Sequence, residues 1–202
     1  MKTFPAICLI ELKDVATGLV TADAMLKAAP VSVLKSGSVH NGKFLILIGG
    51  SVASVEESYH KGLSAAADAI IDRVILPDVD PTVLAAILGK RQKCREAALG
   101  IFETVSVASL LQAADAAVKS MAVRIVEIRL ADDLGGKGLV LYNGQLEDVD
   151  EALTLSKELQ TDAANVIQAQ LIPNLHMELA RQLAQGSRFA GNDLNDLKGG
   201  EV

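Results

Sequence analysis

The chain contains the same sequence pattern twice. Residues 6–31 align without a gap on residues 98–123, and ten of the 26 aligned positions are identical. The first-copy members of the identical pairs are Ala6, Glu11, Val15, Ala16, Leu19, Ala22, Asp23, Ala24, Lys27 and Val31. Two unrelated amphipathic segments would not match this well. The chain is therefore a tandem duplication, and a repeat of this kind constrains the fold before any local pattern does.

The correspondence extends through the rest of both copies. Gly42-Lys43 corresponds to Gly136-Lys137, and residues 74–77 correspond to residues 170–173. The length differences fall between hydrophobic blocks, where surface loops tolerate insertions. The repeat unit is about 90 residues long, a plausible size for one domain.

Apolar periodicity predicts the same order of elements in both copies. The first copy is predicted to contain strand 5–12, helix 17–29, strands 31–35 and 43–48, helix 52–67, strand 69–76 and helix 81–88. The second is predicted to contain strand 98–104, helix 106–120, strands 123–130 and 137–143, helix 146–160, strand 165–172 and helix 175–184. This order is the ferredoxin-like split βαβ plan, an α/β (α+β) fold, and it is not circularly permuted.

These elements divide the chain into four segments. We expect a first domain over residues 1–88, a basic linker over 89–96, a second domain over 97–185 and a flexible tail over 186–202. Four basic residues of the linker, Lys90, Arg91, Lys93 and Arg95, leave two interpretations open. They form either a solvated connection or an anion site.

Composition narrows the possible partners. The net charge of −6 and pI near 5.1 argue against nucleic acid. No apolar run approaches the roughly 18 residues of a membrane span. The first apolar segment recurs inside the chain, so it is predicted to be a strand and not a signal peptide. Half of the residues are hydrophobic, and this surplus favours a homo-oligomer.

The candidate catalytic groups form no known pattern. His40, His60 and His176 are the only histidines, and none lies in a nucleophile-elbow, metal-helix or phosphate-loop motif. Cys8 and Cys94 are the only cysteines, which suggests no disulfide framework and favours a reducing cytoplasm. We therefore expect a protein that is not an enzyme.

Four motifs recur in order in both copies. They are a Glu near the end of the first strand, an Ala-Asp-Ala-x-x-Lys helix, a turn ending in Gly-Lys, and Gly-x-Val/Leu-x-x-Val before the second helix. The ordered set resembles the bacterial microcompartment shell domain over about residues 6–184. Two domains in sequence are similar to the tandem-domain, trimer-forming, single-layer shell proteins, exemplified by the shell trimer of propanediol-utilisation compartments.

The resemblance implies a structural role. Three chains would form a pseudohexagonal homotrimer that tiles a shell facet beside hexameric shell proteins, with encapsulated enzymes as further candidate partners. Lys27 and Lys119 match the family's tile-edge lysine. Asp78 and Asn174 stand where the family has an edge arginine. From the residues alone, each lysine would simply pair with the aspartate four residues before it.

The resemblance also implies a central pore. The turns between the second and third strands would line it, with Ser38, Val39, His40 and Asn41 from the first copy and Asp133, Leu134 and Gly135 from the second. His40 stands where the propanediol-utilisation trimer has a cysteine that ligates an iron–sulfur cluster. Three imidazoles on a threefold axis could bind a metal ion, gate the pore by titration, or line it passively. A tandem small-molecule-sensing regulatory module remains the alternative function.

Overall fold

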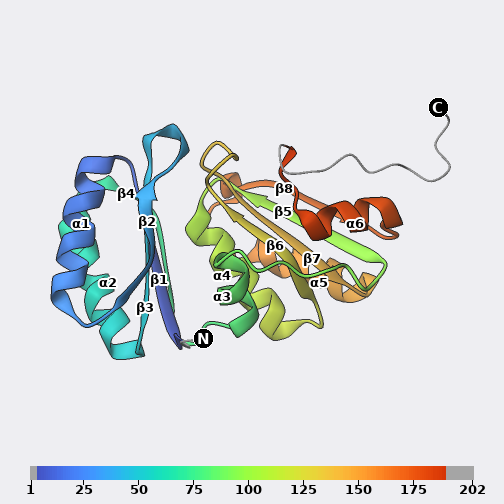
Figure 1. Cartoon of the computed structure of the whole chain (residues 1–202), viewed down its shortest axis with the longest axis horizontal. Helices are drawn as coiled ribbons and strands as arrows, with labels where there is room; N and C mark the ends of the chain where they lie inside the picture. Colours follow the sequence, from blue (N-terminus) through green and yellow to red (C-terminus); the bar gives the residue numbers. More distant parts are fainter. Residues whose placement is uncertain (1–3, 190–202) are drawn as a thin grey trace.

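The computed structural model describes residues 4–189 and shows two lobes with the same order of elements (Figure 1). The first lobe consists of β1 (Ala6–Leu12), α1 (Val15–Ala28), β2 (Ser32–Ser38), β3 (Phe44–Gly50), α2 (Val52–Ala66), β4 (Ile70–Leu76) and α3 (Pro81–Ile87). The second consists of β5 (Ala98–Thr104), α4 (Val107–Ser120), β6 (Arg124–Leu130), β7 (Gly138–Gly144), α5 (Leu146–Glu158), β8 (Val166–Ile172) and α6 (Met177–Gln185). Single 3₁₀ turns lie at His40–Gly42, Ala67–Ala69 and Ala163–Asn165.

Both sheets have the predicted topology. The strand orders are β2-β3-β1-β4 and β6-β7-β5-β8, and every neighbouring pair is antiparallel. The predicted split βαβ fold is confirmed in each copy. The registers also correspond, because Glu11 pairs with Asp72 in the first sheet and Glu103 pairs with Gln168 in the second. Equivalent positions can therefore be compared residue by residue.

Every predicted boundary but one lies within two residues of the observed boundary, and two of the differences have a local reason. Helix α1 begins at Val15 and not at residue 17, because the Asp14 carboxylate accepts a hydrogen bond from the Thr17 N–H at 2.8 Å and caps the helix. Strand β2 runs to Ser38, which pairs with Phe44. The polar Ser-Gly-Ser segment assigned to the turn is therefore part of the strand.

The start of the predicted tail and the predicted linker both contact the second sheet. Gly186 to Phe189 lie within the described residues, and the Ser187 N–H donates to the Glu127 carboxylate at 3.0 Å. The remainder of the predicted flexible tail, residues 190–202, lies outside the described residues. The linker is held against the second sheet, because the Gln92 N–H donates to the Val126 carbonyl at 3.0 Å.

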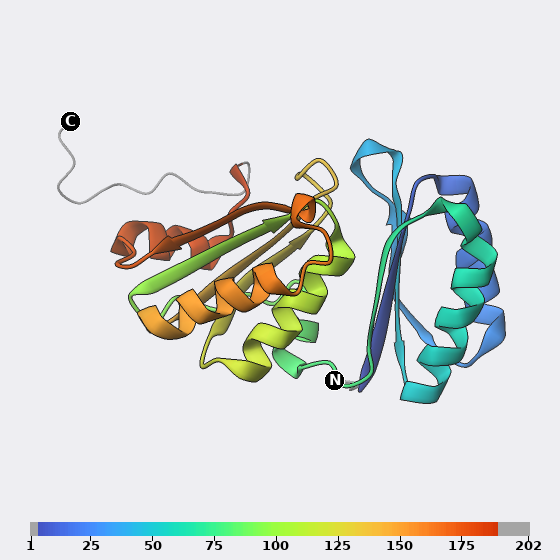
Figure 2. The ribbon, with the colours of Figure 1, turned by 180° about the vertical axis from the view of Figure 1, so that it is seen from behind.

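Helices α1 and α2 cover one face of the first sheet (Figure 2). The core beneath them contains Cys8, Ile10, Met25 and Ile48, all fully buried. Small residues allow the close approach of these layers. A Cβ on Gly18 would meet the Phe44 ring at 2.3 Å, so the helix needs glycine there.

The opposite face of the first sheet packs on the second lobe. Helix α4 lies against β1 and β4, and Ile7 and Leu9 share one buried cluster with Leu110 and Leu111 of α4. The two copies are thus joined by a common core. None of the helices in the part of the chain that the structure describes is long and apolar enough to cross a bilayer.

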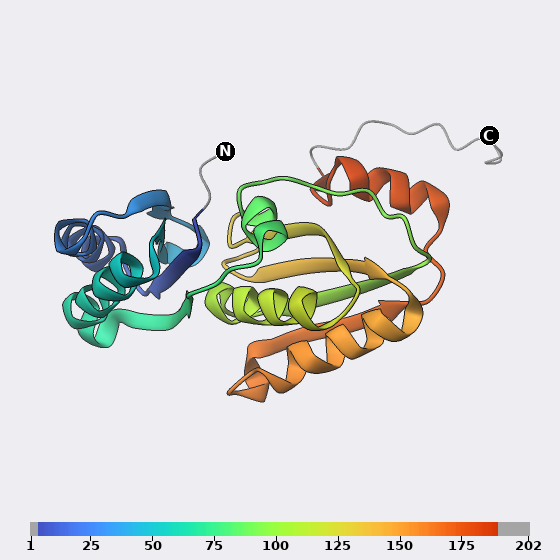
Figure 3. The same cartoon turned by 90° about the horizontal axis from the view of Figure 1, so that it is seen from below.

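The second sheet is covered differently. Helices α4 and α5 lie on one face, and α3 and α6 lie on the opposite side (Figure 3). Leu99, Leu139 and Leu141 of the sheet form a small cluster with Leu183 of α6. In the first lobe, the equivalent face of the sheet is covered by α4 of the second lobe. Within the described residues, much of this face of the second sheet has no such helix from another lobe.

The two cysteines are expected to differ in reactivity. Burial raises the pKa of the Cys8 thiol to about 12 and raises that of Cys94 less. Only the thiolate is nucleophilic, so Cys94 should react with a maleimide at least about tenfold faster than Cys8 in the folded protein. Mass spectrometry after timed labelling measures both rates. Denaturant should abolish the difference; equal rates in native buffer would contradict the buried position of Cys8.

Candidate functional site

The two turns predicted to act together lie side by side. The β2–β3 turn and the β6–β7 turn extend toward the same side of the molecule (Figures 1 and 2). Asn41 Nδ2 donates to the Gly135 carbonyl at 2.7 Å, and the Asp133 N–H donates to His40 Nδ1 at 3.2 Å. Residues from the two copies, more than 90 positions apart, therefore form one site.

Left-handed backbone conformations shape both turns. Asn41, Asp133 and Gly135 have φ values of 65°, 61° and 62°. Gly136, with φ of 82°, also allows the turns to touch, since a Cβ there would lie 3.3 Å from the His40 carbonyl oxygen. Gly, Asn and Asp tolerate this region better than other residues, which accounts for these four positions; Ala131, with φ of 60°, adopts it as well.

The predicted pore residues divide into two groups. Ser38, His40, Asn41, Asp133 and Gly135 are exposed. Val39 and Leu134 are half-buried and support the turns from beneath: Val39 packs against the core shared by the two lobes, and Leu134 packs against the small cluster that contains Leu183.

His40 offers one ring nitrogen for further chemistry. Its Nδ1 accepts the Asp133 N–H, and the nearest carboxylate oxygen, from Asp132, lies 3.9 Å from that atom. Because Nδ1 is the acceptor, the neutral ring carries its proton on Nε2, which is left to donate a hydrogen bond to a ligand. Within residues 4–189 no three His, Cys, Asp or Glu side chains gather in a metal-binding group, so one chain supplies at most one imidazole.

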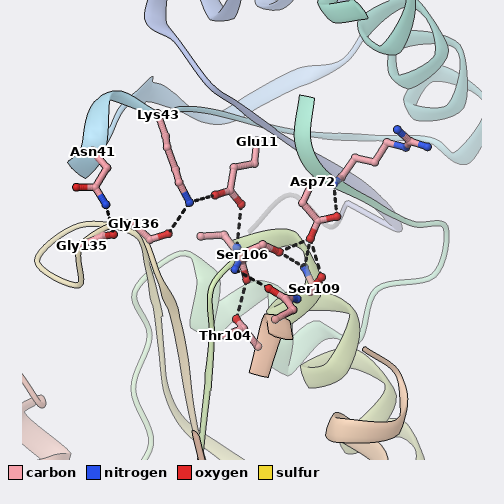
Figure 4. Close-up of polar contacts among 12 residues, drawn as sticks. Glu11, Asn41, Lys43, Asp72, Thr104, Ser106, Ser109, Gly135 and Gly136 are labelled. Carbon is pink, nitrogen blue, oxygen red and sulfur yellow. Dashed lines mark hydrogen bonds and ion pairs between the residues drawn. The ribbon is translucent and has the colours of Figure 1, made fainter. Parts of the chain in front are cut away.

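A buried carboxylate lies behind the turns, at the junction of the two copies (Figure 4). The Glu11 carboxylate accepts from Lys43 Nζ at 2.6 Å and from the Val107 N–H at 2.9 Å, and it is fully buried. Burial raises the pKa of Glu11 above its ordinary value, whereas Lys43 and the Val107 N–H lower it. Burial is the larger effect, so the pKa remains raised.

A second carboxylate of the first sheet binds the start of α4. Asp72 accepts from the Ser109 hydroxyl at 2.6 Å, from the Ser109 N–H at 3.2 Å and from the Ser106 hydroxyl (Figure 4). Ser106 is the N-cap of α4. Anionic groups are favoured at this end of a helix because its N–H groups and dipole are positive.

The four predicted tile-edge residues lie on exposed segments beside helix ends. Lys119 Nζ donates to the Asp78 carbonyl across the junction and to the Asp115 carboxylate at 2.7 Å. Lys27 pairs with Asp23 at 2.6 Å, and its side chain is 74% exposed. Asn174 is exposed at the position equivalent to Asp78. In one chain each lysine thus pairs with the aspartate four residues earlier.

The sequence did not indicate the junction formed by Glu11, Asp72 and Ser106. One signal was present, because a glutamate recurs near the end of an otherwise apolar first strand in both copies. Its partners are contributed by distant segments, and no local pattern identifies them.

Comparison with known proteins is consistent across sequence and structure. The family model described as BMC domain matches residues 6–79 and again residues 98–175. The chain is 37% identical over 181 residues to the bacterial microcompartment shell protein PduT of Citrobacter freundii, covering 90% of this chain and 98% of that protein. It also resembles the crystal structure of a microcompartment protein from Desulfitobacterium hafniense DCB. That match has a TM-score of 0.77 and 39% identity, covering 89% of this chain and 99% of the other.

Proposed function

This chain belongs to the family of bacterial microcompartment (BMC) shell proteins, and we propose that three copies of it close into a ring of six BMC domains that tiles a shell facet. The family and its relatives are structural shell proteins and not enzymes. The chain is thus a shell component with two BMC domains, and the proposal concerns its trimeric state, its pore and its edge contacts.

Unequal burial of the two equivalent helices carries the proposal. Val107 and Leu111 of α4 are fully buried, partly by the first sheet. The equivalent residues of α1, Val15 and Leu19, are 38% and 59% exposed. A helix with the same apolar face and no partner within its chain is predicted to find that partner on another copy.

We assign the receiving surface to the second lobe. Strand β8 is less buried than β4, and Leu179 of α6 is 39% exposed where the equivalent Val83 of α3 is fully buried. In the proposed ring, the α1 face of one copy would pack on this surface of the next. A contact between two different surfaces is heterologous, and repeating it around an axis closes a ring.

The polar residues at the two junctions differ in a complementary way. Inside the chain, the Asp72 carboxylate of β4 accepts a hydrogen bond from the hydroxyl of Ser106, the N-cap residue of α4. Between copies, the equivalent strand residue is Gln168 of β8, and its amide would face the carboxylate of Asp14, the N-cap residue of α1. Each junction then contains one carboxylate at this position. Pairing two first lobes would bring Asp14 against Asp72, and this repulsion favours alternation of the two lobes.

The paired turns support a pore at the centre of such a ring. Three copies would bring three sets of exposed Ser38, His40, Asn41 and Asp133 side chains to the axis. Selectivity in such openings depends on diameter and on the hydrogen-bonding groups that line them. We assign this pore to small polar metabolites, because hydroxyl, imidazole, amide and carboxylate groups dominate its rim.

Metal binding at the axis requires three chains and is testable by substitution. To ligate Zn²⁺ through Nε2, each His40 would release the Asp133 N–H and carry its proton on Nδ1. Three Nε2 atoms would then leave a position open for a further ligand on the ion. If this hypothesis holds, metal analysis of purified protein should give one ion per three chains and none for His40→Ala. Equal metal content in both proteins would refute the His40 site and leave a polar pore.

Edge contact between tiles is expected to depend on the two lysines. Lys27→Ala combined with Lys119→Ala should raise the protein concentration needed for sheets or tubes at least about tenfold, a change of about 1.4 kcal/mol per contact. Electron microscopy over a concentration series measures this. The exposed Lys61→Ala on α2 is the matched control and should assemble normally. Unchanged assembly of the double variant would show that the lysines have no edge role.

A further inference from the structure

A cavity beside the paired turns is lined by an excess of positive charge. It measures about 250 Å³ and lies among α3, the linker and β6. Five basic residues line it: Lys35, Lys90, Arg91, Arg129 and Arg188. Two acidic residues, Glu127 and Asp132, also line it. The local excess of three positive charges, five minus two, contrasts with a chain whose net charge is −6.

The buried carboxylate in this cavity already has its own partners. Glu127 Oε1 accepts two hydrogen bonds from the Arg91 guanidinium, at 2.8 and 3.0 Å. Its Oε2 accepts the Ser187 N–H at 3.0 Å. Both oxygens are engaged, so Glu127 neutralises Arg91 and offers little to the other cations.

The Arg129 guanidinium has a donor that lacks a hydrogen-bond partner among the described residues. Its Nη1 donates to the Ser187 hydroxyl at 3.1 Å, whereas its Nε is buried and has no hydrogen-bond partner within residues 4–189. A buried donor without a partner costs about 1–3 kcal/mol. An arginine whose guanidinium is not fully satisfied by protein groups is suited to bind an oxyanion.

Two lysines that line the cavity are also unpaired in the described part of the chain. Among the residues that the structure describes, neither the Lys35 nor the Lys90 ammonium takes part in an ion pair or a side-chain hydrogen bond. Lys35 comes from β2, Lys90 from the linker and Arg129 from β6. Three cationic groups from three separate segments thus line one cavity that holds one further carboxylate, Asp132, so two positive charges remain uncompensated.

The site has no counterpart in the first copy. Arg129 pairs with Leu139 in the second sheet, and the equivalent position opposite Leu45 is Gly37. The positive charge therefore does not follow from the repeat. It is also formed within one chain, independently of the ring proposed above.

We propose that this cavity is a binding site for a small oxyanion of the phosphate class, held by Arg129, Lys90 and Lys35. A doubly charged tetrahedral anion can accept hydrogen bonds from a guanidinium edge and two ammonium groups at once. Arg188, which also lines the cavity, lies 3.1 Å from the Asp133 carboxylate of the β6–β7 turn. An anion bound here would sit next to the turns assigned to the pore.

Calorimetric titration with inorganic phosphate tests the site. The full chain at low ionic strength should bind one phosphate per chain with a dissociation constant below about 1 mM. Lys90→Gln and Arg129→Gln should each weaken binding at least about tenfold. Lys93→Gln is the matched control, because this exposed linker lysine does not line the cavity and loses the same charge.

Two further measurements separate the outcomes. Thermal melting in phosphate-free buffer shows whether Arg129→Gln is folded, and Lys90→Gln keeps the test valid if it is not. A phosphorylated metabolite such as glycerol phosphate, titrated in parallel, distinguishes free phosphate from a phosphate ester as the preferred ligand. The proposal is overturned if wild-type protein shows no saturable binding, or if Lys90→Gln and Lys93→Gln weaken it equally. Size-exclusion chromatography of the same samples measures their oligomeric state, so that failure of the proposed ring can be distinguished from failure of the phosphate site.

Discussion

Leu19→Lys is expected to convert the proposed trimer into single folded chains. Leu19 is 59% exposed in one chain, so the substitution costs little in folding. In the ring, this position would occupy the environment of Leu111, which is fully buried. An unpaired ammonium buried there costs several kcal/mol, and each ring contains three such contacts. Sedimentation or light scattering should give the mass of one chain, and a cooperative thermal transition should show that this chain is folded.

The neighbouring residue provides the control. Val20 is 64% exposed, and its equivalent on α4, Gln112, is exposed as well. The ring contact therefore does not cover this position, and Val20→Lys should remain trimeric. If Leu19→Lys stays trimeric, or if both variants dissociate, the contact inferred from the repeat is wrong.

Lys43→Met is expected to destabilise the junction between the two lobes. Lys43 is the cationic partner of the fully buried Glu11. Removing one partner of a buried ion pair leaves a buried charge uncompensated and typically costs about 3–5 kcal/mol. Urea unfolding should show this loss. Adding Glu11→Gln should recover much of it, because a neutral amide oxygen can still accept the Val107 N–H.

The loss in Lys43→Met should depend on pH. Burial already raises the pKa of Glu11 above its ordinary 4.5, and removal of Lys43 removes an opposing effect. A group whose pKa is raised on folding contributes stability that is complete below its unfolded pKa and is lost as the pH rises through the folded value. The deficit relative to wild type should therefore shrink toward pH 4.5 and grow above it. A deficit independent of pH would show that Glu11 is not the cause.

The repeat and the apolar periodicity predicted both lobes because they depend on local sequence. The strand β1 and its copy β5 are short apolar runs, and α1 and α4 have helical spacing, so each pattern reports its own element. Errors arose where a helix cap or pairing with another strand decides the boundary. Asp14 extended α1 by capping it, and backbone pairing with β3 carried polar residues into β2.

The candidate site was predictable only in part. The resemblance identified the turns around His40 and Asp133, and the structure brings them into contact. The family match decides against the tandem sensing module that the sequence had left open. Lys27 and Lys119 pair with aspartates as their spacing alone predicts, and their edge role stays a prediction.

The sequence by itself determined that the chain is a duplicated split βαβ unit of the BMC family, because repeats, periodicity and short motifs are properties of neighbouring residues. Only the tertiary structure decided which of two similar helices is buried, which carboxylates lie at the junction, and where unpaired cations meet. Leu19 and Leu111 are the same residue in equivalent positions, yet only Leu111 is covered. Burial and charge pairing depend on contacts between distant segments, which a local pattern does not contain.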